Sequence, residues 1–299
     1  MTYLITGATG FLGKKLINVL LARGDSVNYM GRTQSKHLDP RAAYHPWNGK
    51  DTPPMNSVPR VDAVVHLMGE PIAQRWNAAV KQRIRESRIE STRQLVSGIA
   101  RLPHKPATLV CASAIGYYGN RGNEVLTESS GAGSGFLAEV CRDWEAEALR
   151  ARDSGLRVAT VRTATVLGME GGALPRMLTP FRLGLGGKFG DGKHWMSWIH
   201  VDDLIRLFRF AAENENASGA LNGSSPHPVT NSAFTRTLAR AVHRPAVFPV
   251  PKFALELAFG EMANFLFDSV RVIPQATEQA GFTFNHPELD EALTELLAR

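Results

Sequence analysis

The chain has 299 residues, 43% of them hydrophobic, which is enough to bury one large core or one core with a smaller lobe. Its formal net charge is +6, but basic and acidic residues alternate along the chain, so no basic stripe or tail indicates a nucleic-acid partner. No apolar stretch approaches the roughly 20 residues of a membrane span, and we expect no membrane partner.

The N-terminus and the cysteines bear on where the protein works. A strand-like segment begins at residue 2, which leaves no room for a signal peptide. The two cysteines, Cys111 and Cys141, lie in apolar patterns that are typical of reduced core thiols. We therefore expect a cytoplasmic protein.

A glycine-rich turn joins the first strand to the first helix. Residues 2–5 are strand-like, residues 6–13 read TGATGFLG, and apolar residues follow at helical spacing. The first glycine permits a tight turn, the second lets the backbone approach a pyrophosphate, and the third lets the helix lie close to the strand. The helix N-terminus adds free N–H groups and a positive dipole. The alternative is a glycine-rich turn without a ligand. The predicted dinucleotide-binding residues of this turn are Gly7, Thr9, Gly10, Phe11, Leu12 and Gly13.

The residues after the second strand indicate which dinucleotide binds. An NAD-selective site places Asp or Glu there, where the carboxylate accepts hydrogen bonds from the adenosine ribose hydroxyls. No acid occurs from Ser26 to Leu38, and Arg32 follows Gly31 at the expected place. A guanidinium can hold a 2′-phosphate in its fork, whereas a carboxylate would repel it. We therefore predict NADP(H), with Gly31 and Arg32 at its adenosine end; the alternative for Arg32 is a solvated surface arginine.

Strands and helices alternate through the first half of the chain. Continuous apolar runs of the strand type occupy residues 26–30, 63–67, 108–112 and 158–161, with helical patterns at 77–100 and 137–148. This alternation predicts the α/β class, with a Rossmann-type doubly wound parallel sheet. Ligands collect at the carboxyl ends of such strands. The residues that this argument adds to the cofactor site are Leu67, Met68, Gly69, Arg162, Thr163 and Val166.

The pattern changes after Val166. Glycine-rich loops at residues 168–172 and 184–192 flank a short apolar helix, and a strand enters a helix near residue 200. We expect an NADP-binding Rossmann domain over residues 1–165 and a small C-terminal substrate lobe over residues 166–299. The segment at about 197–225 is expected to return to the first domain.

Several short motifs are shared with a known superfamily. They are TGATGFLG at 6–13, VDAVVHL at 61–67, SAIGYYG at 113–119, WIHVDD at 198–203, GEPI at 69–72, RWN at 75–77, SRIEST at 87–92 and PFRLGLGG at 180–187. The first four resemble the extended short-chain dehydrogenase/reductases. The others are similar to an atypical epimerase-family subgroup, also described as nucleoside-diphosphate-sugar epimerase-like. The resemblance covers essentially the whole chain and implies an extended Rossmann fold with NADP(H), but it implies no particular substrate.

The resemblance also implies a catalytic pair that this chain lacks. Extended dehydrogenase/reductases use Tyr-x-x-x-Lys on the helix after the serine-bearing strand, where the lysine lowers the tyrosine pKa and the tyrosine exchanges a proton with the substrate. The corresponding helix here offers Phe136 with Val140, or Leu137 with Cys141. None of the five tyrosines has a lysine four residues later.

Ser113, Tyr117 and Tyr118 are the nearest replacements by position. Ser113 follows the strand at residues 108–112, and the two tyrosines follow in a glycine-bracketed loop. An alignment on Tyr118 places Ala114, not Ser113, at the usual catalytic serine. The alternative role for both tyrosines is packing.

Two further positions carry expectations. Arg88 occupies the place where extended family members have a cofactor-proximal Asn, and a cation there can meet a phosphate or a substrate anion. His66 ends a strand and is expected to be a hydrogen-bonded structural histidine. No set of His, Cys and acidic residues has metal-ligand spacing, so we expect no metal.

The leading hypothesis is an NADP(H)-dependent oxidoreductase or isomerase that acts on a small polar substrate. The substrate can be anionic, and we expect the protein to be a monomer or a homodimer. The alternative is a non-catalytic NADP(H)-binding sensor or assembly protein. The missing Tyr-Lys pair favours the alternative. The glycine-rich loops of the second lobe favour an enzyme.

Overall fold

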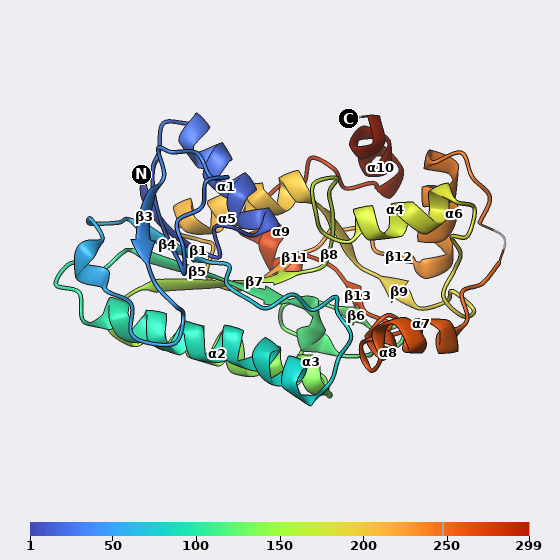
Figure 1. Ribbon diagram of the computed structural model, residues 1–299, viewed down its shortest axis with the longest axis horizontal. Coiled ribbons are helices and arrows are strands. Elements are labelled where there is room, and N and C mark those ends of the chain that lie inside the picture. Colours follow the sequence, from blue (N-terminus) through green and yellow to red (C-terminus); the bar gives the residue numbers. More distant parts are fainter. Residues whose placement is uncertain (247, 299) are drawn as a thin grey trace.

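A seven-stranded parallel sheet forms the centre of the molecule, in the order β11-β7-β5-β4-β1-β2-β3 (Figure 1). The computed structural model of the protein describes residues 1–246 and 248–298. The strands of the sheet are β1 (Thr2–Thr6), β2 (Ser26–Gly31), β3 (Ala43–Pro46), β4 (Ala63–His66), β5 (Thr108–Ala114), β7 (Arg157–Thr163) and β11 (Gly219–Gly223). The predicted doubly wound α/β fold is confirmed.

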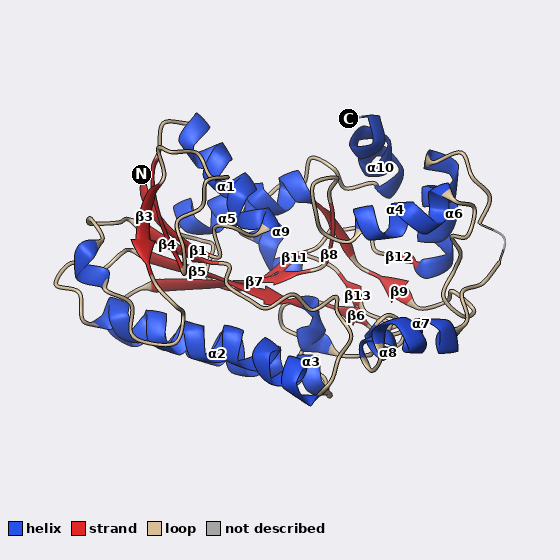
Figure 2. Ribbon diagram, in the orientation of Figure 1, coloured by secondary structure: helices blue, strands red, loops and turns tan. Residues whose placement is uncertain are grey.

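Helices cover both faces of the sheet (Figure 2). The covering helices are α1 (Phe11–Ala22), α2 (Ala78–Ala100), α3 (Phe136–Leu149) and α5 (Val201–Glu213). Tyr3 and Ile5 of β1 share a core with α1 and α5, whereas Leu4 shares another core with α2 and α3. Alternate strand residues point to opposite faces, so a strand that is buried on both sides must be apolar throughout. This requirement explains the continuous apolar runs in the sequence.

The strand β3 was not marked by the sequence pattern. It lies at the edge of the sheet and pairs only with β2. None of its residues is buried, and Pro46 ends it. An edge strand with little buried surface needs no apolar run, which is why hydrophobicity did not reveal it.

The second lobe has its own core. Leu178, Phe234 and Leu293 pack around Trp198 there. These residues come from α4 (Leu174–Arg182), α6 (Asn231–Ala241), α10 (Leu289–Ala298) and β10 (Trp198–His200). Residues 201–223 form α5 and β11, and β11 belongs to the central sheet. The exact division between the two domains stays a prediction.

Short strand pairs and helices lie outside the central sheet, and the pair of β6 (Val125–Leu126) with β13 (Arg271–Val272) joins the two lobes. β8 (Thr165–Leu167) pairs with β10, and β9 (Trp195–Met196) with β12 (Val229–Thr230). The remaining helices are α7 (Lys252–Phe259), α8 (Met262–Phe265) and α9 (Gln275–Gln279), with short 3-10 turns η1 (Met55–Ser57), η2 (Ile115–Tyr118) and η3 (Arg150–Ser154). Among the described helices, none combines the length and apolar character that a membrane crossing requires.

Candidate functional site

The glycine-rich turn between β1 and α1 is pressed against the end of β4. Gly7 has a φ of 71°, and a Cβ there would lie 2.6 Å from the carbonyl of Leu67. A Cβ on Gly13 would lie 2.4 Å from the carbonyl oxygen of Gly7. Only glycine fits these two positions, because the backbone after β4 leaves no space for a side chain at Gly7 and the backbone of the turn leaves none at Gly13.

The space around Gly10, in the same turn, is open. Its φ is −73°, and a Cβ there would meet only the carbonyl oxygen of Gly7, at 3.2 Å. Phe11 begins α1, whose first turn carries neither an acidic residue nor a side-chain cap. The first N–H groups of the helix and its positive dipole are therefore available to an anion. This cradle fits a pyrophosphate.

The predicted cofactor residues share one edge of the sheet. Because the strands are parallel and β7, β5, β4, β1 and β2 are neighbours, their carboxyl ends lie side by side. The predicted cofactor residues at these ends are half-exposed or exposed. They are Gly31 and Arg32 at and after the end of β2, Leu67, Met68 and Gly69 after β4, and Thr163 and Val166 at and after the end of β7.

Arg32 begins an acid-free loop with an anchored backbone. The hydroxyl of Tyr44 donates a hydrogen bond to the carbonyl of Gly31 at 3.2 Å. The N–H of Ser35 donates to the hydroxyl of Tyr29, also at 3.2 Å. The Arg32 side chain is exposed, and no described residue pairs with its guanidinium. The loop therefore presents a cation that has no internal partner to give up when it binds an anion.

A buried polar network lies where β5 and β7 end. The two carboxylate oxygens of Glu145 accept hydrogen bonds from Arg162 at 2.9 and 2.8 Å, and Ser113 Oγ donates to the same carboxylate at 2.6 Å. Arg162 also donates to the Tyr118 hydroxyl at 3.0 Å, and that hydroxyl donates to Asn222 at 2.7 Å. All five side chains are buried.

This network corrects what we expected of Ser113, Tyr118 and Arg162. Their polar groups are turned into the protein, where each already has a partner. Burial raises the pKa of Tyr118 to about 12, so its hydroxyl keeps its proton. Tyr117 is half-buried, and the centroid of its ring lies 3.5 Å from the Arg162 guanidinium. Periodicity could not reveal this arrangement, because Asn222 is 104 residues from Tyr118.

Arg88 is also directed inward. Its Nη1 donates to the carbonyl oxygens of Glu70 at 3.0 Å and Ile84 at 3.2 Å, and its guanidinium lies 5.2 Å from the centroid of the Trp144 ring. A Cβ on Gly69 would come within 3.0 Å of the guanidinium carbon. Burial lowers the pKa of Arg88. The expected contact with a phosphate or a substrate anion is therefore replaced by a role in holding the segment after β4.

His66 is a structural histidine, as predicted. Its Nδ1 lies 2.6 Å from Thr6 Oγ1 and its Nε2 lies 3.3 Å from Ser91 Oγ. The side chain is fully buried, and burial lowers its pKa to about 3. His66 is therefore neutral across the physiological range.

A cleft of about 290 Å³ lies between the start of α3 and the segment around α8. Phe136 and Leu137, which stand where the family's Tyr-x-x-x-Lys pair would begin, line it on one side. Trp76 meets the Phe136 ring edge-on, with centroids 5.4 Å apart. Lys81 of α2 forms an ion pair with Glu261 at 2.7 Å, which joins the two lobes at this cleft.

One group of side chains within residues 1–246 and 248–298 has the composition of a metal site. The ligand atoms of His200, Asp202, His286 and Glu295 lie within 4.8 Å of one another. However, His200 Nδ1 accepts a hydrogen bond from the Asp202 N–H at 3.1 Å, which places the ring proton on Nε2, 2.9 Å from Glu295. Asp202 pairs with Lys15 at 2.8 Å. These contacts leave His200 no free lone pair for a cation, and the absence of a metal stays a prediction.

Two protein-family models match the chain, and the first of them covers nearly all the residues of the central sheet. Residues 3–222 match the NAD dependent epimerase/dehydratase family, and residues 250–296 match a domain of unknown function, DUF1731. The chain belongs to the NAD dependent epimerase/dehydratase family, which confirms the resemblance seen in its motifs.

Individual relatives match over nearly the whole chain. The epimerase family protein YfhF of Bacillus subtilis is 37% identical over 299 residues, covering 100% of this chain and 98% of that protein. A chloroplastic homolog of epimerase family protein SDR39U1 from Arabidopsis thaliana is 38% identical, covering 99% of this chain and 87% of that protein. The crystal structure of human SDR39U1 isoform 2 with NADPH has a TM-score of 0.90 at 34% identity, and both chains are covered completely.

Proposed function

We propose that the protein binds NADP(H) and uses it in an oxidoreductase or isomerase reaction on a small polar substrate. The observation that carries this proposal is the open cradle at Gly10 beside the exposed guanidinium of Arg32, at the ends of the neighbouring strands β1 and β2. The cradle at Gly10 accommodates a pyrophosphate, and the guanidinium of Arg32 accommodates a 2′-phosphate. The NADPH in the crystal structure of human SDR39U1 supports the same cofactor here.

The residues that would hold the cofactor follow the edge of the sheet. The N–H groups at the start of α1 would bind the pyrophosphate, and Arg32 the 2′-phosphate. Bound NADP(H) supplies or accepts a hydride. The residues proposed for its nicotinamide half are Leu67, Met68, Gly69, Thr163 and Val166, which end or follow β4 and β7.

We place the substrate in the cleft beside Phe136. From the sequence, we expected Arg88 to contact a phosphate or a substrate anion. Because the Arg88 guanidinium is directed into the protein, it does not support an anionic substrate. Of the three candidate catalytic side chains, Tyr117 is the one whose hydroxyl lies outside the Glu145 network among the described contacts. We further propose that the protein is a cytoplasmic monomer or homodimer without a membrane partner. Because its charges are dispersed along the chain, we also propose that it has no nucleic-acid partner.

A non-catalytic NADP(H) sensor is the second candidate. It is favoured because the hydroxyls of Ser113 and Tyr118 are hydrogen-bonded within the buried network and do not face a substrate. Phe136 and Leu137 provide no acid or base at the start of α3. A sensor would bind NADP(H) but would turn over no substrate.

The cofactor assignment is tested by titrating NADPH and NADH into the wild type and the Arg32→Ala variant. Loss of a charge-assisted contact costs about 1.5–3 kcal/mol, so Arg32→Ala should weaken NADPH binding about 10- to 150-fold and leave NADH binding unchanged. Arg60→Ala is the matched control, because Arg60 is an exposed arginine just before β4, at the opposite edge of the sheet. Equal affinity of the wild type for both cofactors would contradict the proposal.

A further inference from the structure

Asp268 brings an additional acidic group to the cleft beside Phe136. It is half-buried, and none of the described residues forms a hydrogen bond or ion pair with its carboxylate. The other charged side chains that line the cleft, Lys81 and Glu261, neutralise each other at 2.7 Å. A half-buried carboxylate without a partner is unfavourable, and such groups in clefts are candidates for function.

The backbone beside Asp268 is fixed by both lobes. The N–H of Ser269 donates to Asn120 Oδ1 at 3.2 Å, and Ser269 Oγ donates to the carbonyl of Gly122 at 2.6 Å. The N–H of Trp195 donates to the same Oγ at 3.0 Å. Asp268 is therefore held at a defined place between the loop after β5 and the second lobe, as proton transfer to a bound molecule requires.

The opposite wall of the cleft is apolar. Phe136, Leu137 and Trp76 line it and belong to a small hydrophobic cluster between α2 and α8. Burial in these surroundings raises the pKa of Asp268. A carboxyl group with a raised pKa is better suited to donate a proton near neutral pH than an exposed one.

We propose that Asp268 is the proton donor of this cleft and that the cleft takes a neutral carbonyl compound. The inference rests on the proposed function. The substrate's carbonyl oxygen takes the proton of Asp268, whose O–H electron pair stays on the carboxylate, and a proton (H⁺) taken up from the solvent later restores the acid. The carbonyl carbon takes the hydride of NADPH, so the carbonyl compound, NADPH and one proton become an alcohol and NADP⁺. An anionic substrate is disfavoured, because the carboxylate that remains after the proton transfer would repel it.

The first measurement needs no substrate. The pKa of Asp268 is measured in the cofactor-free protein by carbon NMR with labelled aspartate, and its signal is assigned as the one lost in Asp268→Asn. The expected result is a pKa above the ordinary aspartate value, with a further response when NADPH is added. A value at or below the ordinary one, or no response to NADPH, overturns the proposal.

The second measurement follows NADPH oxidation with neutral 2,3-butanedione and anionic pyruvate as probes. The wild type should reduce butanedione in preference to pyruvate. Asp268→Asn should lower kcat about 100-fold or more, with the NADPH affinity and the circular dichroism spectrum unchanged. The matched control is Asp290→Asn, an exposed aspartate of the second lobe, which should keep full activity.

The remaining outcomes separate this inference from the proposed function. Undiminished turnover in Asp268→Asn, or no turnover of butanedione by the wild type, overturns the role of Asp268 while NADPH binding stands. Loss of activity in Tyr117→Phe alone would assign the proton to Tyr117 instead. A wild type that fails to bind NADPH would refute the proposed function itself.

Discussion

Gly10 differs from the other two glycines of its turn in the space around its Cα. Gly7 and Gly13 face backbone at distances that exclude a side chain, and Gly7 also needs a positive φ. Gly10 has a φ that any residue adopts and meets a single oxygen at 3.2 Å. The fold therefore requires the first and third glycines, whereas the second is explained by a ligand that must approach the backbone.

Gly10→Val is thus predicted to abolish NADPH binding while the protein stays folded. The added side chain would occupy the space that the pyrophosphate needs. NADPH fluorescence measures the binding and circular dichroism the fold. Gly131→Val serves as the control, because a Cβ there meets nothing within 4 Å. NADPH binding at wild-type strength in Gly10→Val would refute the assigned role.

His66 makes stability depend on pH. Its pKa is lowered from 6.5 to about 3 by burial, so below pH 6.5 the unfolded chain binds a proton there that the folded chain does not. Stability should therefore fall with falling pH between 6.5 and about 3, by about 1.4 kcal/mol per pH unit from this residue. Urea unfolding of the wild type and His66→Asn at pH 6.5 and 5 measures the difference. An identical loss in both proteins would contradict the assignment.

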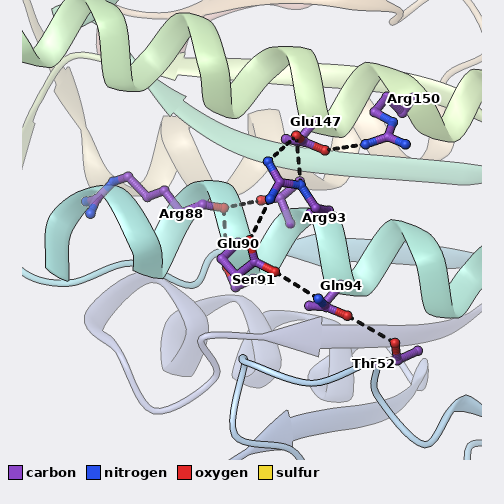
Figure 3. A network of polar contacts seen from close by, with 9 residues as sticks. Thr52, Arg88, Glu90, Ser91, Arg93, Gln94, Glu147 and Arg150 are labelled. Carbon is purple, nitrogen blue, oxygen red and sulfur yellow. Dashed lines mark hydrogen bonds and ion pairs between the residues drawn. The ribbon is translucent and has the colours of Figure 1, made fainter. Parts of the chain in front are cut away.

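At the scale of elements, α3 carries two carboxylates in different surroundings. Glu145 points into the protein and holds Arg162 of β7. Glu147, two residues later, lies in a surface network in which Arg93 of α2 bridges it to Glu90 and Arg150 pairs with it from the C-terminal end (Figure 3). Both contacts fasten α3 to its neighbours, but only the first is shielded from water.

Glu145→Gln should lower the free energy of unfolding by about 3 kcal/mol or more, because it leaves the buried Arg162 charge uncompensated. Glu147→Gln should cost no more than about 1 kcal/mol, because its partners Arg93 and Arg150 are exposed. Urea unfolding of the two variants provides a matched comparison on one helix. Equal costs would show that the Glu145 network does not fasten α3 to the sheet.

The strands that could be predicted from the sequence are those that lie inside the sheet, where both of their faces are buried. β1, β4, β5 and β7 are continuous apolar runs because helices cover both of their faces. The sequence pattern did not reveal β3, because a half-exposed edge strand is under no such constraint. The helical pattern predicted at 77–100 agrees with α2 (Ala78–Ala100), and the structure adds that Asn77 caps it by accepting a hydrogen bond from the Val80 N–H.

At the scale of the whole molecule, the parallel sheet with the glycine-rich turn at the end of β1 was predictable, and the cleft was not. The turn at residues 6–13 and Arg32 are local motifs that keep their meaning in any parallel sheet. The directions of Ser113 and Tyr118 depend on Glu145 and Asn222, which only the fold brings to them. Asp268 has no motif around it, and the pairing of β13 with β6 brings its segment to the first lobe.

The central claim is that the first two strands present an NADP(H) site. A crystal structure determined with NADPH tests it most directly, because it locates both phosphate positions at once. We predict the pyrophosphate against the N–H groups of Phe11 and Leu12 at the start of α1, with the 2′-phosphate in contact with the Arg32 guanidinium. A pyrophosphate bound away from this turn, or a 2′-phosphate that makes no contact with Arg32, would contradict the account.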